Sequence, residues 1–138
     1  MRNGIVLIVD DEKLTADAIS TYLAKTSKDF SYFVSRNSAE EAFNFLPELP
    51  EYENEEFKLL ITDFNLGKSQ WIKNGVELAR LIKDLHPDVR VIIMSSSRKA
   101  RDECGKYGYH FLRKQFSLIA LKDAIDTVMR APHPVRDE

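Results

Sequence analysis

The 138-residue chain is 43% apolar and 30% charged, which is typical of a single globular domain large enough to bury a core. Its net charge of −2 gives no reason to expect nucleic-acid binding by the chain as a whole, and its longest strongly apolar stretch, residues 5–9, is too short for a membrane span or a signal peptide. Because Cys104 is the only cysteine, an internal disulfide and a cysteine-pair metal site are excluded. The simplest expectation is a cytoplasmic protein without membrane contact.

Five apolar runs alternate with five amphipathic segments. The runs predict strands at residues 4–9, 30–34, 59–61, 89–94 and 109–113. The amphipathic segments predict helices at residues 12–25, 38–46, 75–85, 98–107 and 117–129, with capping residues at Ser38 and Ser117. Such alternation predicts an α/β domain in which a doubly wound, five-stranded parallel sheet carries helices on both faces.

The helical spacing also predicts which side chains face the core. Leu14 in the first helix, Leu85 in the third and Leu118 in the last are expected on buried faces. The glutamate-rich residues 48–56 lack helical periodicity, so a solvated loop is favoured over an acidic docking patch. We expect one domain over residues 1–131 and a loose C-terminal tail over residues 132–138, which contain two prolines.

Polar side chains follow four of the predicted strands. They are Asp10 and Asp11 after the first strand, Asp63 after the third, Ser95 after the fourth and Lys114 after the fifth. In the flavodoxin-like strand order 2-1-3-4-5, the first and third strands are neighbours, and ligands bind at the carboxyl ends of the strands. The three carboxylates should therefore crowd together, which favours a divalent cation such as Mg²⁺. Lys114 would offer a charge for phosphate oxygens and Ser95 a hydroxyl donor.

Each of these residues also has an ordinary structural interpretation. Asp10 and Asp11 could simply cap the first helix, Asp63 could be a turn residue, and Lys114 could be a solvated surface lysine. Those interpretations require separate coincidences at one edge of the sheet, so a combined metal and phosphate site is favoured.

With these residues in view, the sequence resembles the receiver domain of two-component response regulators over nearly the whole chain. The acidic pair Asp10 and Asp11, the acceptor-like Asp63, the hydroxyl of Ser95 and Lys114 occur in the order typical of that family. The resemblance implies that a histidine kinase or a phosphotransfer protein phosphorylates Asp63. The domain would catalyse its own phosphorylation and dephosphorylation, as a signalling domain rather than a conventional enzyme.

The resemblance also implies roles for individual residues. Asp11, Asp63 and the backbone carbonyl of Asn65 would ligate Mg²⁺ directly, and Asp10 would act through water. Asn65 and Ser97 would tune the lifetime of the phosphoryl group. Ser95 and Phe111 match the positions of the family's switch hydroxyl and switch aromatic, although Phe111 could equally be a core residue. The implied signalling face comprises the fourth helix, the fifth strand and the fifth helix, and includes Tyr107, Tyr109 and Lys122.

Three features depart from the family pattern. Gln115 follows Lys114 where the family usually has a proline in a cis peptide, so either that geometry is retained without proline or the loop differs. Gly67 stands where proline is common. Residues 68–74 form an apparent insertion whose Trp71 could limit access to the site or contact a partner, although packing against the third helix is the simpler expectation.

The sequence also bears on two other function classes. An aspartate-nucleophile phosphatase would require a second acid two residues after Asp63, where Asn65 stands. A degenerate receiver that binds partners without phosphorylation remains the alternative. The output could be a downstream protein, an effector domain or a phosphorylation-dependent homodimer, and the chain could be a stand-alone receiver or part of a longer regulator.

Overall fold

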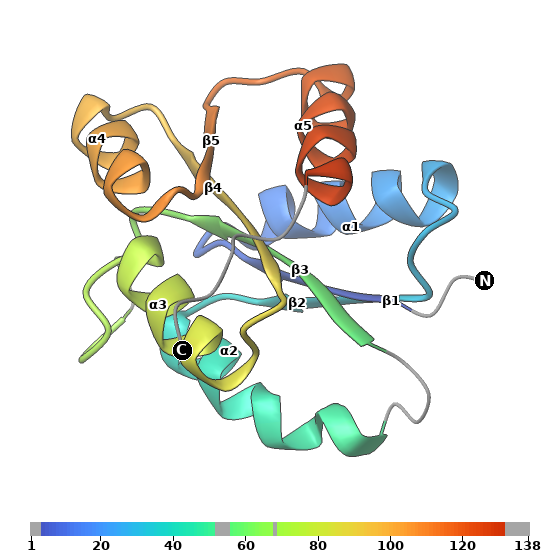
Figure 1. The fold of residues 1–138 in the computed structure, drawn as a ribbon, viewed down its shortest axis with the longest axis horizontal. Coiled ribbons are helices and arrows are strands. Elements are labelled where there is room, and N and C mark those ends of the chain that lie inside the picture. Colours follow the sequence, from blue (N-terminus) through green and yellow to red (C-terminus); the bar gives the residue numbers. More distant parts are fainter. Residues whose placement is uncertain (1–3, 52–55, 68, 132–138) are drawn as a thin grey trace.

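The computed structural model describes residues 4–51, 56–67 and 69–131. Five parallel strands form one sheet in the order β2-β1-β3-β4-β5, which confirms the predicted doubly wound fold. The strands are β1 (Gly4–Val9), β2 (Tyr32–Arg36), β3 (Glu56–Asp63), β4 (Arg90–Ser95) and β5 (His110–Arg113). The helices are α1 (Lys13–Thr26), α2 (Ala39–Phe45), α3 (Gly75–Leu85), α4 (Arg98–Tyr107) and α5 (Leu118–Arg130), and a short 3-10 helix, η1 (Leu46–Glu51), follows α2. Figure 1 shows the twisted sheet between these helices.

The alternation of side chains along the strands builds a separate core on each face of the sheet. In β1, Ile5, Leu7 and Val9 pack with α2, α3 and α4, whereas Val6 and Ile8 pack with α1 and α5. Both faces of the central strands are therefore covered, which explains why their sequences are continuously apolar.

Side-chain caps begin four of the five α-helices that follow the strands. Ser38, Ser97 and Ser117 each accept a hydrogen bond from a backbone N–H in the first turn of α2, α4 and α5. Asn74 does the same for α3. These caps satisfy amides that would otherwise lack partners, and they determine where each helix starts.

Several predicted details were wrong. Leu14 is 83% exposed, Leu85 is 58% exposed and Leu118 is 45% exposed, so none of them lies on a buried face. Part of the predicted acidic loop is ordered, because residues 46–51 form η1 and β3 begins at Glu56. The predicted tail, residues 132–138, lies outside the described residues. Over the described ranges, no helix combines the length and apolarity needed to cross a membrane.

The loop between β3 and α3 is anchored to the start of α2. The Glu40 carboxylate accepts hydrogen bonds from the backbone N–H groups of Gln70 (3.1 Å), Trp71 (3.1 Å) and Ile72 (2.9 Å). Burial alone raises the pKa of Glu40, but these three hydrogen bonds outweigh it and hold the pKa below its usual value. Trp71 packs edge to face on Phe43 of α2, with ring centroids 5.9 Å apart.

Candidate functional site

The strand register brings the predicted site residues to one edge of the sheet. Val9 at the end of β1 pairs with Thr62 of β3, so Asp10 and Asp63 follow on adjacent strands. Ser95 ends β4 beside Arg113 of β5, and the backbone N–H of Lys114 donates to the Ser95 carbonyl oxygen at 3.0 Å. The parallel sheet thus gathers side chains from four separate segments.

Three carboxylates lie together at this edge. Asp10, Asp11 and Asp63 each offer an oxygen within 4.8 Å of the others. Asp10 is completely buried and Asp63 is 5% exposed, whereas Asp11 is half-buried. One Asp10 oxygen accepts the Glu12 N–H at 2.9 Å, and an Asp11 oxygen accepts the Gly67 N–H at 3.3 Å. A proline at position 67 could not donate this hydrogen bond.

Lys114 is the cation that faces this acidic cluster. Its Nζ lies 3.2 Å from Asp63 Oδ2 and 3.5 Å from Asp10 Oδ2. Burial by itself lowers the pKa of Lys114, but the attraction of Asp63 and Asp10 outweighs that effect, and the pKa is raised above its usual value. Lys114 is therefore fully protonated at neutral pH, and its charge is shared between two carboxylates.

The two buried carboxylates are harder to ionise than ordinary aspartates. Burial raises the pKa of Asp63 to about 6, because desolvation outweighs the attraction of Lys114 and the repulsion of Asp10 adds to it. Burial likewise raises the pKa of Asp10 above its usual value, against the hydrogen bond from Glu12 and the charge of Lys114. At neutral pH the ionised cluster is therefore electrostatically unfavourable, and added positive charge would stabilise it.

We expect Asp63→Asn to stabilise the metal-free protein at pH 7.5. The pKa of Asp63 rises on folding from 3.8 to about 6, so the native state binds this proton more tightly than the unfolded state does. The contribution of Asp63 to stability is therefore most favourable below pH 4 and falls as the pH rises through 6. Two pKa units correspond to roughly 3 kcal/mol. Because Lys114 also loses a partner, the net gain should be about 1–2 kcal/mol.

Urea unfolding without Mg²⁺, at pH values from 4 to 7.5, measures this effect. The gain of Asp63→Asn should shrink towards pH 4, and Asp17→Asn on the exposed surface of α1 serves as the matched control. A variant less stable than the wild type at pH 7.5 would contradict the unfavourable burial of this charge.

The remaining predicted residues surround the cluster in different ways. Ser95 is 1% exposed, and its Oγ accepts the Ser97 N–H at 3.0 Å. Ser97 caps α4 through its own hydroxyl, which accepts the Ala100 N–H at 3.4 Å. Phe111 is half-buried against the core on the α3 and α4 side of the sheet, and Asn65 is exposed just beyond β3. The predicted site residues thus lie around one end of the sheet.

The predicted signalling residues fall into two separate places. Tyr107 and Tyr109 stack with their ring centroids 5.8 Å apart, and the Arg80 guanidinium lies 4.6 Å from the centre of the Tyr107 ring. Lys122 instead lines a hollow between α5 and the end of α1, with Leu23 and Thr26 among its neighbours.

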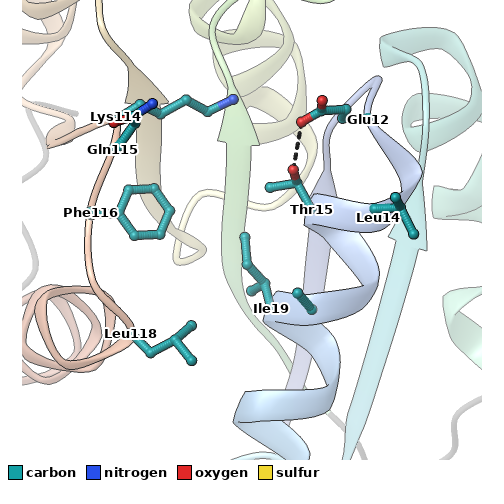
Figure 2. A pocket seen from close by; sticks show the side chains of 9 residues that line it. Glu12, Leu14, Thr15, Ile19, Lys114, Gln115, Phe116 and Leu118 are labelled. Carbon is teal, nitrogen blue, oxygen red and sulfur yellow. Dashed lines mark hydrogen bonds between the residues drawn. The ribbon is translucent and has the colours of Figure 1, made fainter.

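A partly apolar groove adjoins the site between α1 and the segment that joins β5 to α5. The Lys114–Gln115 peptide in this segment is cis. The groove encloses about 490 Å³ and is lined by residues that include Leu14, Ile19, Lys114, Phe116 and Leu118. In Figure 2, Lys114 reaches over the end of β3 while Phe116 and Leu118 point from the segment towards α1.

Sequence reasoning missed Glu40 and the Gly67 N–H. The spacing of Ser38 and Glu41 drew attention to the cap of α2, but nothing local marked Glu40, whose three partners are 30 to 32 residues away. The Gly67 N–H contacts Asp11, which is 56 residues away. A glycine where the family pattern expects proline was the only available signal for that contact.

The residues at this edge fit a small divalent cation. Three carboxylates lie together, two of them are buried, and the Lys114 ammonium contacts only those two. All the available ligands are oxygens, the donor type that Mg²⁺ prefers, and the half-buried Asp11 leaves one side of the cluster accessible.

A family model described as the response regulator receiver domain matches residues 6–126. One similar solved structure is a response regulator receiver domain protein from Clostridium thermocellum, with 22% identity, 91% of this chain and 94% of that chain covered, and a TM-score of 0.73. Another is a CheY-like receiver domain protein from Methanospirillum hungatei JF-1, with 21% identity, 91% of this chain and 93% of that chain covered, and a TM-score of 0.70. A third is the isolated REC domain of RcsB from Salmonella enterica serovar Typhimurium, in the presence of the phosphomimetic BeF3⁻. Its identity is 19%, the match covers 96% of this chain and 92% of that chain, and the TM-score is 0.75. A search of curated proteins finds no match. Because the family model spans most of the chain, this protein belongs to the family of response regulator receiver domains.

Proposed function

We propose that this chain is a phosphoacceptor that takes a phosphoryl group from a histidine kinase or a phosphotransfer protein onto Asp63. The arrangement of Asp63 carries the proposal: its carboxylate lies 3.2 Å from the Lys114 ammonium and within 4.8 Å of oxygens from Asp10 and Asp11. A nucleophile, a cation for phosphoryl oxygens and a set of metal ligands thus meet at one place. Membership of the receiver family supports the same reaction.

The chemistry follows from the protonation state of Asp63. Although its pKa is raised, the value of about 6 is still below neutral pH, so the carboxylate is mostly ionised there. One of its oxygens attacks the phosphorus, and a P–O bond forms while the P–N bond to the donor histidine breaks. Such transfers depend mainly on alignment and charge stabilisation, and Lys114 stands where the developing charge on the phosphoryl oxygens would be.

Asp11, Asp63 and the backbone carbonyl of Asn65 would hold Mg²⁺ directly, and Asp10 would hold it through water. When bound, the ion supplies positive charge that offsets the crowded carboxylates and the phosphoryl oxygens. In a later step, water attacks the acyl phosphate, inorganic phosphate leaves and the free carboxylate is restored. Asn65 and Ser97 flank the path of that water and tune the lifetime of the phosphoryl group.

The output depends on the hydroxyl of Ser95. In the present structure this hydroxyl accepts the Ser97 N–H. This hydroxyl would rotate to donate to a phosphoryl group on Asp63, and Phe111 on β5 would turn inward as the hydroxyl moves. This change alters the face formed by α4, β5 and α5, including Tyr107 and Tyr109, and that face contacts a downstream protein, an effector domain or a second copy of the chain.

The groove of Figure 2 supports approach by a protein donor. Leu14 is 83% exposed and Leu118 is 45% exposed, although both are large apolar side chains. Lys114 lines the same groove and contacts Asp63, so a protein seated there would bring its phosphohistidine close to the acceptor.

Binding of beryllofluoride tests the acceptor and its switch together. With Mg²⁺ present, we expect beryllofluoride to shift the backbone amide resonances of Ser95, Ser97 and Phe111 in the wild type and to leave Asp63→Asn unchanged. Asp17→Asn, which removes a carboxylate from the exposed surface of α1, should respond as the wild type does. Unchanged spectra in the wild type would replace this proposal with a degenerate receiver that binds partners without phosphorylation.

A further inference from the structure

Three arginines gather around a hollow between α4 and β5, which lie side by side in Figure 1. The hollow encloses about 270 Å³. It is lined by Ser96, Ser97, Arg98, Arg101, Phe111 and Arg113. The arginines come from two elements, since Arg98 and Arg101 lie one turn apart on α4 whereas Arg113 ends β5.

The three arginines of this hollow have no ion-pair partner in the described part of the chain. Arg98, Arg101 and Arg113 are exposed, and none of them forms an ion pair within the part of the chain that the structure describes. No carboxylate lines the hollow, and Glu103 on the same helix is engaged with Lys106 at 3.2 Å. The amino-terminal end of α4 also borders the hollow and adds partial positive charge.

The remaining wall defines the kind of anion that fits. Phe111 supplies an apolar surface, and the hydroxyls of Ser96 and Ser97 supply hydrogen-bonding groups. Guanidinium groups bind carboxylates in a bidentate manner, and an aromatic wall suits the methylene groups that carry them. The chain has a net charge of −2, and these three arginines converge on one hollow, whereas a nucleic acid requires a basic stripe along its backbone.

We propose that this hollow binds a glutamate- or aspartate-rich segment of the protein that receives the signal. The inference rests on the proposed function, because it names the chemistry of the partner recognised by the face formed by α4, β5 and α5. The arginines bind the carboxylates of the segment, and in the unphosphorylated form Phe111 contacts its aliphatic parts.

The hollow is hydrogen-bonded to Ser95, the residue that the proposed switch uses. Ser97 lines it, and the Ser97 N–H donates to Ser95 Oγ at 3.0 Å. When the Ser95 hydroxyl turns towards a phosphoryl group on Asp63, this N–H loses its acceptor and becomes free to donate to a bound carboxylate. Phosphorylation should therefore strengthen binding of the acidic segment, and by linkage the segment should stabilise the phosphorylated form.

The direct test is titration with a hexaglutamate peptide that is acetylated and amidated at its ends. We expect saturable shifts in the backbone amide resonances of Arg98, Arg101 and Phe111. The double variant Arg101→Gln with Arg113→Gln should bind about tenfold more weakly. Arg130→Gln at the far end of α5 removes a comparable exposed arginine and should bind within twofold of the wild type.

Three results would overturn the proposal. The first is equal weakening by Arg130→Gln, which would indicate non-specific attraction. The second is a set of shifts that avoids the hollow. The third is tighter binding of a single-stranded oligonucleotide than of the peptide at the same salt concentration, which would indicate a nucleic-acid site.

A second titration, in the presence of beryllofluoride, tests this inference separately from the proposed function. With beryllofluoride and Mg²⁺, peptide affinity should rise about fivefold in the wild type and stay unchanged in Asp63→Asn. Beryllofluoride shifts without peptide binding would refute the acidic-segment proposal and leave the phosphoacceptor intact. Peptide binding without any effect of beryllofluoride would retain the hollow as a binding site and refute its connection to the switch.

Discussion

Replacing Lys114 with methionine is expected to slow the phosphorylation of Asp63 by acetyl phosphate about 100-fold or more. The Lys114 ammonium lies 3.2 Å from Asp63 Oδ2, so its removal takes away the charge that would stabilise the transferring phosphoryl oxygens. Loss of one such positioned donor costs roughly 10²–10³ in rate. Methionine preserves most of the length and the apolar contacts of the lysine side chain.

The variant should also move the titration of Asp63. The attraction of Lys114 lowers the pKa of Asp63 against its burial, so without this lysine the pKa should lie above its present value of about 6. Raising the pH would then recover the fraction of ionised Asp63 but not the lost charge stabilisation. A variant that regains the wild-type rate at high pH would show that Lys114 acts only through the protonation state of Asp63.

Lys106→Met is the matched control for this substitution. Lys106 has a side chain that is 66% exposed and pairs with Glu103 on the surface of α4, where ion pairs contribute little. Its phosphorylation rate should equal that of the wild type. Equal slowing in both variants would contradict a specific role for Lys114.

Gly75→Ala should destabilise the fold by about 3 kcal/mol and displace the acceptor. A Cβ at position 75 would lie 2.3 Å from the Asp63 carbonyl oxygen and 3.2 Å from the Phe64 Cα. Both contacts are with backbone, so no side-chain rotation can relieve them. The Gly75 N–H also donates to the Phe64 carbonyl at 2.9 Å, which ties the start of α3 to the end of β3.

Gly105→Ala, in contrast, should stabilise the protein. A Cβ there meets nothing within 4 Å, and the residue lies inside α4, so alanine should stabilise the protein by about 0.5–1 kcal/mol. Urea unfolding of both variants measures the difference, and the phosphorylation rate of Gly75→Ala should fall because Asp63 shifts. Similar stability changes for the two glycines would contradict the close approach at Gly75.

The sheet and the acidic cluster were predictable because they depend on regular geometry. Residues that alternate along a strand face opposite sides, so the continuously apolar runs indicated a sheet covered on both faces. Parallel strands end at one edge, so Asp10, Asp63, Ser95 and Lys114 could be brought together without knowledge of any contact. The strand register and the contacts of Lys114 agree with that expectation.

The errors about buried leucines arose because the same helical periodicity fits both buried and exposed apolar side chains. Leu14 and Leu118 have the spacing of core residues, but they lie in the first turns of their helices and are largely exposed beside the groove. Helical periodicity identifies a face and does not reveal whether another element covers it at each turn. The structure was also needed for Glu40, because a carboxylate that binds backbone amides 30 to 32 residues away leaves no local pattern.

The arginine hollow could not be found from the sequence for a related reason. Arg98 and Arg101 lie in a helix of mixed charge, and Arg113 ends a short strand. Their convergence depends on how α4 packs against β5, which the order of residues does not state. Ser97 lies in a run of serines that is typical of a loop, whereas in the structure it caps α4 and lines the hollow.

Intact mass after incubation with acetyl phosphate tests the central claim most directly. The wild type should gain one phosphoryl group in the presence of Mg²⁺ and none after removal of the metal with a chelator, and Asp63→Asn should gain none in either condition. Phosphorylation that persists in Asp63→Asn, or a wild type that stays unmodified with Mg²⁺ present, would contradict the assignment of Asp63 as the phosphoacceptor.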